Sequence, residues 1–353
     1  MKTIYLGGAG GAPTNNVIWS LRCSGDERLI GTSCEPTDLF LADVDERYWV
    51  PRADSQDYRA HIAALVKRTR PDFMHFQNDF EIRAISRMRA ELEVTGAKLF
   101  MPRPEVIENC VDKHASYEIW RREGVRTPET ILLKEDSDLR NAFDRFGGTV
   151  WLRAIEGGGG RGALPTSDFE LAKRWVEHFE GWGMFTAAEL LSSQSVTWLS
   201  IWYEGELVVA QTRRRRNWSF GNRTLSGVTG VTGVGETWSS DEVTSLSLDS
   251  IRAVDDRPHG IYGVDMTYDR EGRPNVTEIN ISRFFTTVYF FTEAGLNMPR
   301  IAVDIAIYGK FPSLDRRINP LPDGLLWIRG MDQRPVLTTD KEIEALIEKS
   351  QIA

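Results

Sequence analysis

Three side chains that carry oxygen ligands, Asp265, Glu278 and Asn280, lie on two stretches that predict adjacent strands of one hairpin. Because side chains alternate between the two faces of a strand, these three should share one face. The residues expected on the opposite face are Val264, Thr277 and Ile279. Carboxylate and amide oxygens are the hard ligands that Mg²⁺ prefers, so the pattern predicts a divalent-cation site. The sequence leaves open that these acids simply face solvent or pair with arginines.

The turn Arg270–Arg273 joins the two predicted strands as a four-residue loop, which is an ordinary hairpin length. This register places Asp265 opposite Glu278, and Tyr268 opposite Asn275. Two directly opposed carboxylates repel each other and destabilise a hairpin, so a cation should compensate for them. Magnesium is usually held by one or two carboxylates together with the phosphates of a substrate, and it fits this gap.

A glycine-rich segment, GGGGRG at 157–162, follows a predicted strand. Its backbone meets little steric hindrance and can present amide hydrogens to phosphates. The segment lacks the G-x-x-x-x-G-K-[ST] pattern of a Walker loop. Taken alone, it is equally compatible with a flexible surface turn.

The basic run Arg213–Arg216 stands at the end of another predicted strand. Alternation directs Arg213 and Arg215 to one face and Arg214 and Arg216 to the other. The run is compatible with a solvated strand end and with an anion clamp, since guanidinium groups match phosphate and carboxylate oxygens bidentately. The long loop expected at 217–240, which carries Trp218 and Phe220, is predicted to shape a substrate pocket.

The first 100 residues or so alternate between buried strands and helices, beginning with KTIYL at 2–6 and NNVIWSLR at 15–22. Such alternation predicts a parallel sheet with crossover helices. The GGAGG turn at 7–11 lacks a full G-x-G-x-x-G, so a structural turn is favoured over a dinucleotide site.

The pattern changes after residue 110. An amphipathic helix is predicted at 111–124, an edge strand at 125–133, and strands on both sides of the glycine segment. Further along, we expect two strands joined by a turn at Glu204–Gly205, a helix at 241–254, a helical segment at 292–309 and a tail at 325–353. The tail should hold a strand LLWIRG, a second short strand PVLT and a closing helix.

Composition excludes several classes of protein. A net charge of −8 argues against nucleic-acid binding by bulk positive charge, and no apolar run reaches the length of a membrane helix. Three cysteines without C-x-x-C spacing fit a reducing compartment, and the first residues lack the apolar core of a secretory signal. We therefore expect a cytoplasmic protein that binds neither nucleic acid nor membrane, with a homodimer as the default assembly.

Taken in order, four segments resemble the ATP-grasp superfamily, and within it the carbamoyl-phosphate-synthetase-like carboxylate-amine ligases. They are DKHASYEIWRREGVRTPET, WLRAIEGGGGRGA, AAELLSSQSVTWLSIWYEGEL and GIYGVDMTYDREGRPNVTEINISRF, and the resemblance spans approximately residues 1–310. It implies an α/β (α+β) fold with a Rossmann-like pre-ATP-grasp domain at 1–110, a central segment and glycine-loop lid at 111–210, and a mixed-sheet lobe at 211–310. Residues 311–353 would form a carboxy-terminal extension.

The resemblance also assigns roles to single residues. It implies ATP as cofactor, held by Lys113, Arg153, Gly157, Gly158, Gly159, Gly160, Glu189, Leu190 and Leu191, and Mg²⁺ (or Mn²⁺) held by Asp265, Glu278 and Asn280. It also implies a catalytic role for Arg283, and from the arginine run itself we expect Arg213 and Arg215 to be catalytic cations. Read without the resemblance, Lys113 is compatible with an exposed helical lysine and Glu189 with a strand-end acid.

Two departures from the family pattern affect this assignment. In many members the corresponding arginine lies one residue earlier, at the position that Ser282 occupies here. This shift leaves the target of Arg283 open. Ser193 and Gln194 replace a glycine and a ribose-binding glutamate.

The activity that the resemblance implies is an ATP-dependent ligation of a small carboxylate to an amine through an acyl phosphate. Both substrates are expected to be small molecules, such as an amino acid or a related metabolite. The alternatives are a phosphate-transferring enzyme of the carbamoyl-phosphate type and a non-catalytic nucleotide or dinucleotide sensor.

Overall fold

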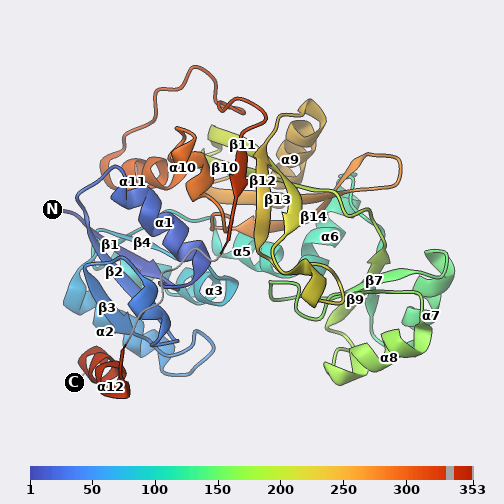
Figure 1. Cartoon of the computed structure of the whole chain (residues 1–353), viewed down its shortest axis with the longest axis horizontal. Helices are drawn as coiled ribbons and strands as arrows, with labels where there is room; N and C mark the ends of the chain where they lie inside the picture. Colours follow the sequence, from blue (N-terminus) through green and yellow to red (C-terminus); the bar gives the residue numbers. More distant parts are fainter. Residues whose placement is uncertain (331–337, 352–353) are drawn as a thin grey trace.

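A computed structural model describes residues 1–330 and 338–351 of the chain. Its strands form a five-stranded, a four-stranded and a six-stranded sheet (Figure 1). No helix within these residues is long and apolar enough to cross a membrane.

The N-terminal lobe is built on a parallel sheet, as predicted, and its strand order is β3-β2-β1-β4-β5. Its strands are β1 (Thr3–Gly7), β2 (Arg28–Ser33), β3 (Glu46–Trp49), β4 (Phe73–His75) and β5 (Lys98–Leu99). The helical segments are α1 (Ala12–Arg22), a 3-10 turn (Asp38–Leu41), α2 (Tyr58–Thr69), α3 (Asp79–Arg87) and α4 (Arg89–Glu93). The turn after β1 requires glycine, because a Cβ on Gly10 would lie 1.8 Å from the carbonyl oxygen of Asp38.

The next segment forms a separate small body around the four-stranded sheet β6-β9-β7-β8, at the lower right of Figure 1. We call this body, residues 129–189, the lid. Its elements are β6 (Thr130–Leu133), α7 (Asp136–Arg145), β7 (Val150–Ala154), β8 (Leu164–Thr166), α8 (Phe169–His178) and β9 (Phe185–Glu189). It has its own apolar core, in which Leu133, Leu152 and Ala187 are fully buried. The predicted edge strand is confirmed as β6. Two helices, α5 (Pro104–Val111) and α6 (Lys113–Arg122), connect the lid to the N-terminal lobe.

The C-terminal lobe contains the sheet β14-β13-β10-β11-β12-β15, which is antiparallel throughout. Its strands are β10 (Ser195–Tyr203), β11 (Glu206–Trp218), β12 (Thr232–Thr237), β13 (Gly260–Tyr268), β14 (Pro274–Ile281) and β15 (Leu326–Ile328). Helix α9 (Asp241–Val254) covers it where a helix was predicted. The expected boundary at 210/211 falls inside β11, and the whole division into four segments stays a prediction.

The prediction of a long loop at 217–240 was wrong over part of that range. Strand β11 continues to Trp218 and β12 begins at Thr232, so that only 219–231, with a short 3-10 turn at Gly221–Arg223, lie between them. Strand β12 carries several small and polar residues, but it is paired with β11 on one side and β15 on the other. Tertiary pairing therefore overrides the weak local preference of this segment.

The predicted hairpin exists, with one difference in register. Asp265 lies opposite Glu278 as expected, but Tyr268 pairs with Pro274 and not with Asn275. A β-bulge at Thr277 accounts for the shift, because an extra residue in one strand breaks the alternation at that point. Val264 and Ile279, which were expected on the opposite face, lie in the apolar core. Thr277 was expected on that face too, but it lines the cavity described below.

The helical segment expected at 292–309 divides into α10 (Tyr289–Glu293) and α11 (Met298–Tyr308). In the tail, the predicted strand LLWIRG and the closing helix correspond to β15 and α12 (Asp340–Ser350), and most of the predicted strand PVLT lies outside the described residues. Helix α12 packs against β3 of the N-terminal lobe, where the backbone N–H of Trp49 donates to Ser350 Oγ at 2.7 Å.

Candidate active site

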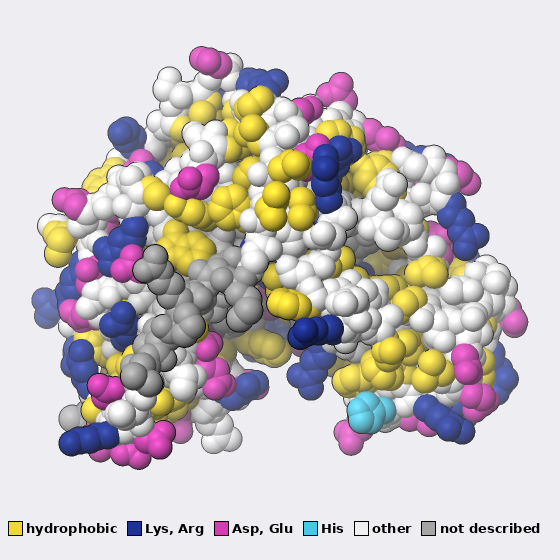
Figure 2. Space-filling view, viewed as in Figure 1, with side chains coloured by type: hydrophobic (Ala, Val, Ile, Leu, Met, Phe, Trp, Pro, Cys, Tyr) yellow, Lys and Arg dark blue, Asp and Glu magenta, His cyan; other side chains and the backbone are white. Residues whose placement is uncertain are grey.

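A cavity of about 470 Å³ lies between the lid and the C-terminal lobe. In the view of Figure 2, the surface is notched between the N-terminal lobe and the lid. The cavity wall comes from β7, the glycine segment, residues 188–193, Ser195, the loop 226–228 and the β13–β14 hairpin. Segments that are far apart in the sequence therefore meet around one space, which is large enough for a nucleotide-sized ligand.

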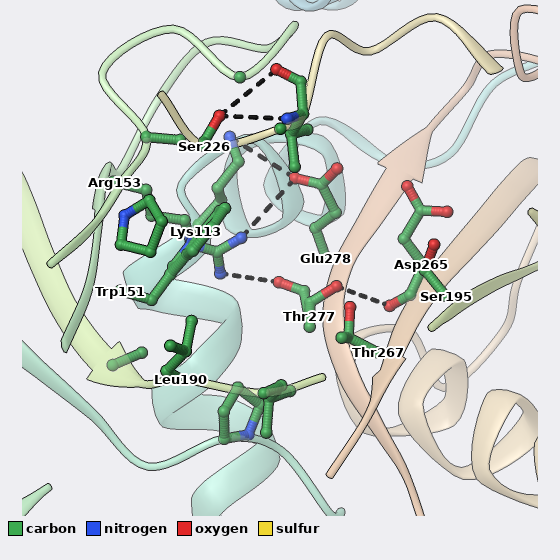
Figure 3. Close-up of a pocket in the computed structure, with 18 of the residues that line it drawn as sticks. Lys113, Trp151, Arg153, Leu190, Ser195, Ser226, Asp265, Thr267, Thr277 and Glu278 are labelled. Carbon is green, nitrogen blue, oxygen red and sulfur yellow. Dashed lines mark hydrogen bonds and ion pairs between the residues drawn. The ribbon is translucent and has the colours of Figure 1, made fainter. Parts of the chain in front are cut away.

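Glu278 stands among cations on the wall of this cavity (Figure 3). Its Oε2 lies 3.9 Å from Lys113 Nζ and 4.0 Å from Arg153 Nη1. Lys113 is the first residue of α6, which is capped by Asp112, and its ammonium donates to the Gly157 carbonyl at 2.6 Å. Arg153 donates to the Thr277 carbonyl at 2.8 Å. The exposed-lysine alternative for Lys113 is excluded, because its side chain is only 11% exposed.

The electrostatics of the cavity favour an anionic ligand. Burial would raise the pKa of Glu278, but Lys113, Arg153, Arg283 and Arg215 outweigh burial and hold that pKa below its ordinary value. Burial lowers the pKa of Lys113, Arg153 and Arg215, and the attraction of Glu278 opposes this effect. Three cations therefore share two carboxylates, those of Glu278 and Asp265, and an additional negative group would balance them.

The carboxylate of Asp265 is held by two donors. Asn280 Nδ2 donates to Asp265 Oδ2 at 2.9 Å, and the Thr197 hydroxyl donates to Oδ1. Because the amide nitrogen faces Asp265, the amide oxygen is the atom of Asn280 that remains for a cation. No group of three or more His, Cys, Asp or Glu side chains suited to a metal occurs among the described residues. Two carboxylates and an amide nevertheless fit Mg²⁺, which takes only a few protein ligands.

The arginine run alternates as predicted, and its two faces differ. Arg214 and Arg216 both form ion pairs with Glu236. Arg215 lines the cavity and donates to Ser195 Oγ at 2.6 Å. Its guanidinium carbon, Cζ, lies 3.5 Å from the centre of the Trp218 ring. Arg213 is 1% exposed and is not among the lining residues; burial, followed by Arg215, lowers its pKa to about 9. Arg215 alone of this run is placed to touch a ligand in the cavity.

Arg283 also lies away from the cavity lining. The residue before it, Ser282, has a φ of 57°, a left-handed conformation that is costly for a side chain other than glycine. This turn ends β14 and brings Arg283 Nε to 3.0 Å from Asp79 Oδ1, on the first residue of α3. This partner could not be predicted from local sequence patterns, because Asp79 lies 204 residues earlier.

The opposite end of the cavity is apolar. Leu190, Leu191, Trp151 and Pro128 line it, and in Figure 3 Leu190 and Trp151 lie across the cavity from Asp265. Glu189 also lines the cavity, and its Oε1 accepts a hydrogen bond from the backbone N–H of Glu129 at 3.0 Å. Of the two residues that replace the glycine and the glutamate of the family pattern, Ser193 lines the cavity and Gln194 does not. Sequence reasoning missed Trp151, although it stands two residues before Arg153 on one strand and so shares its face.

The glycine segment forms the roof of the cavity. Gly157, Gly158, Gly159 and Gly160 all line it. The loop after β11 packs directly on this segment, because a Cβ on Gly160 would lie 2.6 Å from the Val228 carbonyl oxygen and a Cβ on Gly230 only 2.8 Å from Gly159 Cα. This contact was not predicted. Trp218 lines the cavity, whereas Phe220, the other aromatic expected there, is half exposed and outside the lining.

No family model matches the chain, but solved structures share its architecture. An L-amino acid ligase from Bacillus licheniformis aligns with a TM-score of 0.67 at 12% identity, covering 87% of this chain and 74% of that one. An N5-carboxyaminoimidazole synthetase from Staphylococcus aureus aligns with a TM-score of 0.64 at 13% identity, covering 88% of this chain and 78% of that one. The biotin carboxylase domain of a Hydrogenobacter thermophilus 2-oxoglutarate carboxylase aligns with a TM-score of 0.67 at 18% identity, covering 92% of this chain and 73% of that one. The chain therefore has the ATP-grasp fold.

Proposed function

We propose that this protein is an ATP-dependent ligase that activates a small carboxylate as an acyl phosphate and joins it to an amine, with release of ADP and phosphate. The observation that carries the proposal is the position of Glu278 among Lys113, Arg153 and Arg215, on the wall of a cavity roofed by the glycine segment. This arrangement combines a cation ligand with phosphate-binding groups at one place.

In this proposal the nucleotide occupies the cavity with its base at the apolar end and its phosphates at the charged end. Leu190, Leu191 and Trp151 contact the base, and Glu189 lies near the sugar. Lys113, Arg153 and the glycine segment, Gly157–Gly160, hold the phosphates. The H. thermophilus neighbour was crystallised with MgADP and bicarbonate, which supports a nucleotide in a cavity of this fold.

Asp265, Glu278 and Asn280 are the residues that would hold Mg²⁺, and Mn²⁺ has the same ligand preference. A bound divalent cation would offset the negative charge of the transferring phosphoryl group. The residues of this chain do the remaining work. Arg153 and Lys113 orient the phosphates, Arg215 offers a further cation, and the glycine segment keeps water from the reactive groups.

The chemistry proceeds in two balanced steps. A substrate carboxylate oxygen attacks the terminal phosphorus of ATP, the bond to the bridging oxygen breaks, and ADP and an acyl phosphate result. The amine nitrogen then attacks the acyl carbon, phosphate leaves with the bonding electrons, and the nitrogen loses a proton. The amide is formed without a covalent enzyme intermediate.

The decisive experiment is a screen of ADP release with Mg²⁺, ATP and small carboxylates, offered alone and in pairs with amines. Amino acids belong in the screen because one neighbour is an L-amino acid ligase, and bicarbonate because another was crystallised with it. ADP release that requires both a carboxylate and an amine is the expected result. Release without any amine would instead support a phosphate-transferring enzyme, and NAD binding without ATP turnover would support a sensor.

A matched pair of variants connects this activity to the cavity. Glu278→Gln should abolish ADP release and leave the fold intact. Glu271→Gln, in the exposed turn of the same hairpin, should leave the rate of ADP release unchanged. Undiminished turnover of Glu278→Gln would refute the proposed cation site.

A further inference from the structure

Arg213 is a buried cation with an unusual set of partners. Its guanidinium donates to three threonine hydroxyls, those of Thr232 and Thr287 at 3.0 Å and that of Thr197 at 2.7 Å. It also lies 4.5 Å from the centre of the Phe285 ring, and within the described part of the chain no ion pair with a carboxylate is formed. A buried charge without a directly bound counterion is costly, and its retention here needs a reason.

A row of paired residues connects Arg213 to the proposed cation site. Arg213 of β11 lies opposite Thr197 of β10, Thr197 opposite Asp265 of β13, and Asp265 opposite Glu278 of β14. Directly opposed residues in an antiparallel sheet point to the same face, so the four side chains form one line across four strands.

The direction of the hydrogen bonds along this row is fixed by chemistry. A guanidinium group has only donors, so the Thr197 oxygen must accept from Arg213. The single hydroxyl proton of Thr197 is therefore left for Asp265 Oδ1, where the hydroxyl is in contact. Asn280 occupies Oδ2 from the other side. Both oxygens of Asp265 are thus oriented, and each retains a lone pair for a further ligand.

We propose that Arg213 and Thr197 are positioning residues, which fix the Asp265 carboxylate in the orientation that binds the divalent cation. The inference rests on the proposed function and extends it to two buried residues that touch neither the nucleotide nor the cation. Arg213, expected from the sequence to be catalytic, acts in this account through Thr197 and Asp265.

Two isosteric substitutions separate positioning from a merely structural role. Thr197→Val and Thr287→Val each remove one hydroxyl that accepts from the same guanidinium, at positions that are 1% and 0% exposed. Of these two threonines, only Thr197 touches Asp265. Loss of an outer-shell partner weakens a metal site by about 10- to 100-fold, and only Thr197→Val should show this loss.

The experiment measures Mn²⁺ binding to the full-length protein by electron paramagnetic resonance, with saturating ADP as the nucleotide. We expect a dissociation constant for Mn²⁺ raised about tenfold or more in Thr197→Val, near the wild-type value in Thr287→Val, and restored in Thr197→Ser. The affinity for ADP without metal should be the same in all four proteins. Circular dichroism and thermal unfolding verify folding, and Thr197→Ala is tested in the same way if Thr197→Val does not fold.

Equal weakening in the two valine variants, or an unchanged dissociation constant in Thr197→Val, would overturn the inference. Glu278→Gln distinguishes this failure from failure of the proposed function. If Glu278→Gln loses Mn²⁺ while the two valine variants behave alike, the cation site stands and the positioning role falls. If the wild-type protein with ADP binds no more Mn²⁺ than Glu278→Gln does, both fall.

Discussion

Arg83 of α3 lies 3.1 Å from the carboxylate of Glu156, the residue directly before the glycine segment. The same guanidinium is 2.6 Å from Glu108, so it links the N-terminal lobe, α5 and the roof of the cavity. The contact connects the N-terminal lobe to the lid directly before the glycine segment.

Removing this link should loosen the roof. We expect Arg83→Ala to raise the KM for ATP by about two- to fivefold, because a partly exposed ion pair contributes up to about 1 kcal/mol, and to change kcat less. Arg87→Ala is the matched control, since Arg87 lies on the same helix and pairs with Glu108 but not with Glu156. Initial rates of ADP release decide the matter, and equal effects of the two substitutions would contradict a role for the Glu156 contact.

A second prediction concerns the contact between the two glycine-rich loops. Gly230 has a φ of +72° and its Cβ would lie 2.8 Å from Gly159 Cα, whereas Gly227, with a φ of +71°, has nothing within 4 Å. Alanine at either position meets the same left-handed backbone strain, but only Gly230→Ala also forces the loops apart. Overpacking costs about 1–3 kcal/mol, so the closed arrangement should be disfavoured about 5- to 150-fold.

If the closed roof protects the acyl phosphate, Gly230→Ala should release more ADP per amide formed than Gly227→Ala does. The two products are measured in the same reaction. An identical ratio for both variants would show that the contact does not control hydrolysis.

The shared face of Asp265, Glu278 and Asn280, on which the proposed cation site depends, could be predicted from the sequence because side-chain alternation is a local rule. The observed turn pairs Tyr268 with Pro274 and by itself would place Asp265 opposite Thr277, so the expected pair of Asp265 and Glu278 depends on the bulge as well. The bulge at Thr277 could not be predicted, because strand pairing and packing decide where an extra residue is accommodated.

Residues whose positions depend on tertiary contacts could not be predicted from the sequence for the same reason. The left-handed Ser282 directs Arg283 to Asp79 in another lobe, and no local pattern encodes that partner. Strand β12 was missed because its pairing with two neighbours, and not its own composition, makes it a strand. Thr197 gave no signal at all, since a threonine on a buried strand is ordinary until its neighbours are known.

Trp218 allows a third prediction, about the second substrate. Its ring stacks on Arg215, and both residues line the cavity. We expect Trp218→Ala to change kcat/KM among amines more than it changes the KM for ATP, while Trp218→Phe, which retains a ring for Arg215, should have a smaller effect. Rates with a panel of amines at fixed ATP test this, and an equal loss for ATP and all amines would count against the assignment.

The last prediction concerns stability and lies outside the cavity. Glu81 on α3 is 6% exposed and accepts hydrogen bonds from Tyr58 at 3.1 Å and Asn78 at 2.5 Å. Burial raises the pKa of Glu81 from 4.5 to about 7, although both hydrogen bonds oppose this shift. The folded state therefore binds more protons than the unfolded state between these two values, and the free energy of unfolding falls as the pH rises through this window.

Glu81→Gln removes this dependence. Relative to the variant, the wild-type protein should lose on the order of 3 kcal/mol of unfolding free energy between about pH 4.5 and 7. His75 acts in the opposite direction, because burial lowers its pKa from 6.5 to about 4 and stability then rises with pH. The contribution of His75 is common to both proteins and cancels in the difference. Urea unfolding at pH 5, 6, 7 and 8 measures that difference, with the exposed Glu93→Gln as control. A difference that stays constant over this range would show that Glu81 does not titrate there, because a buried carboxyl with an ordinary pKa is ionised throughout.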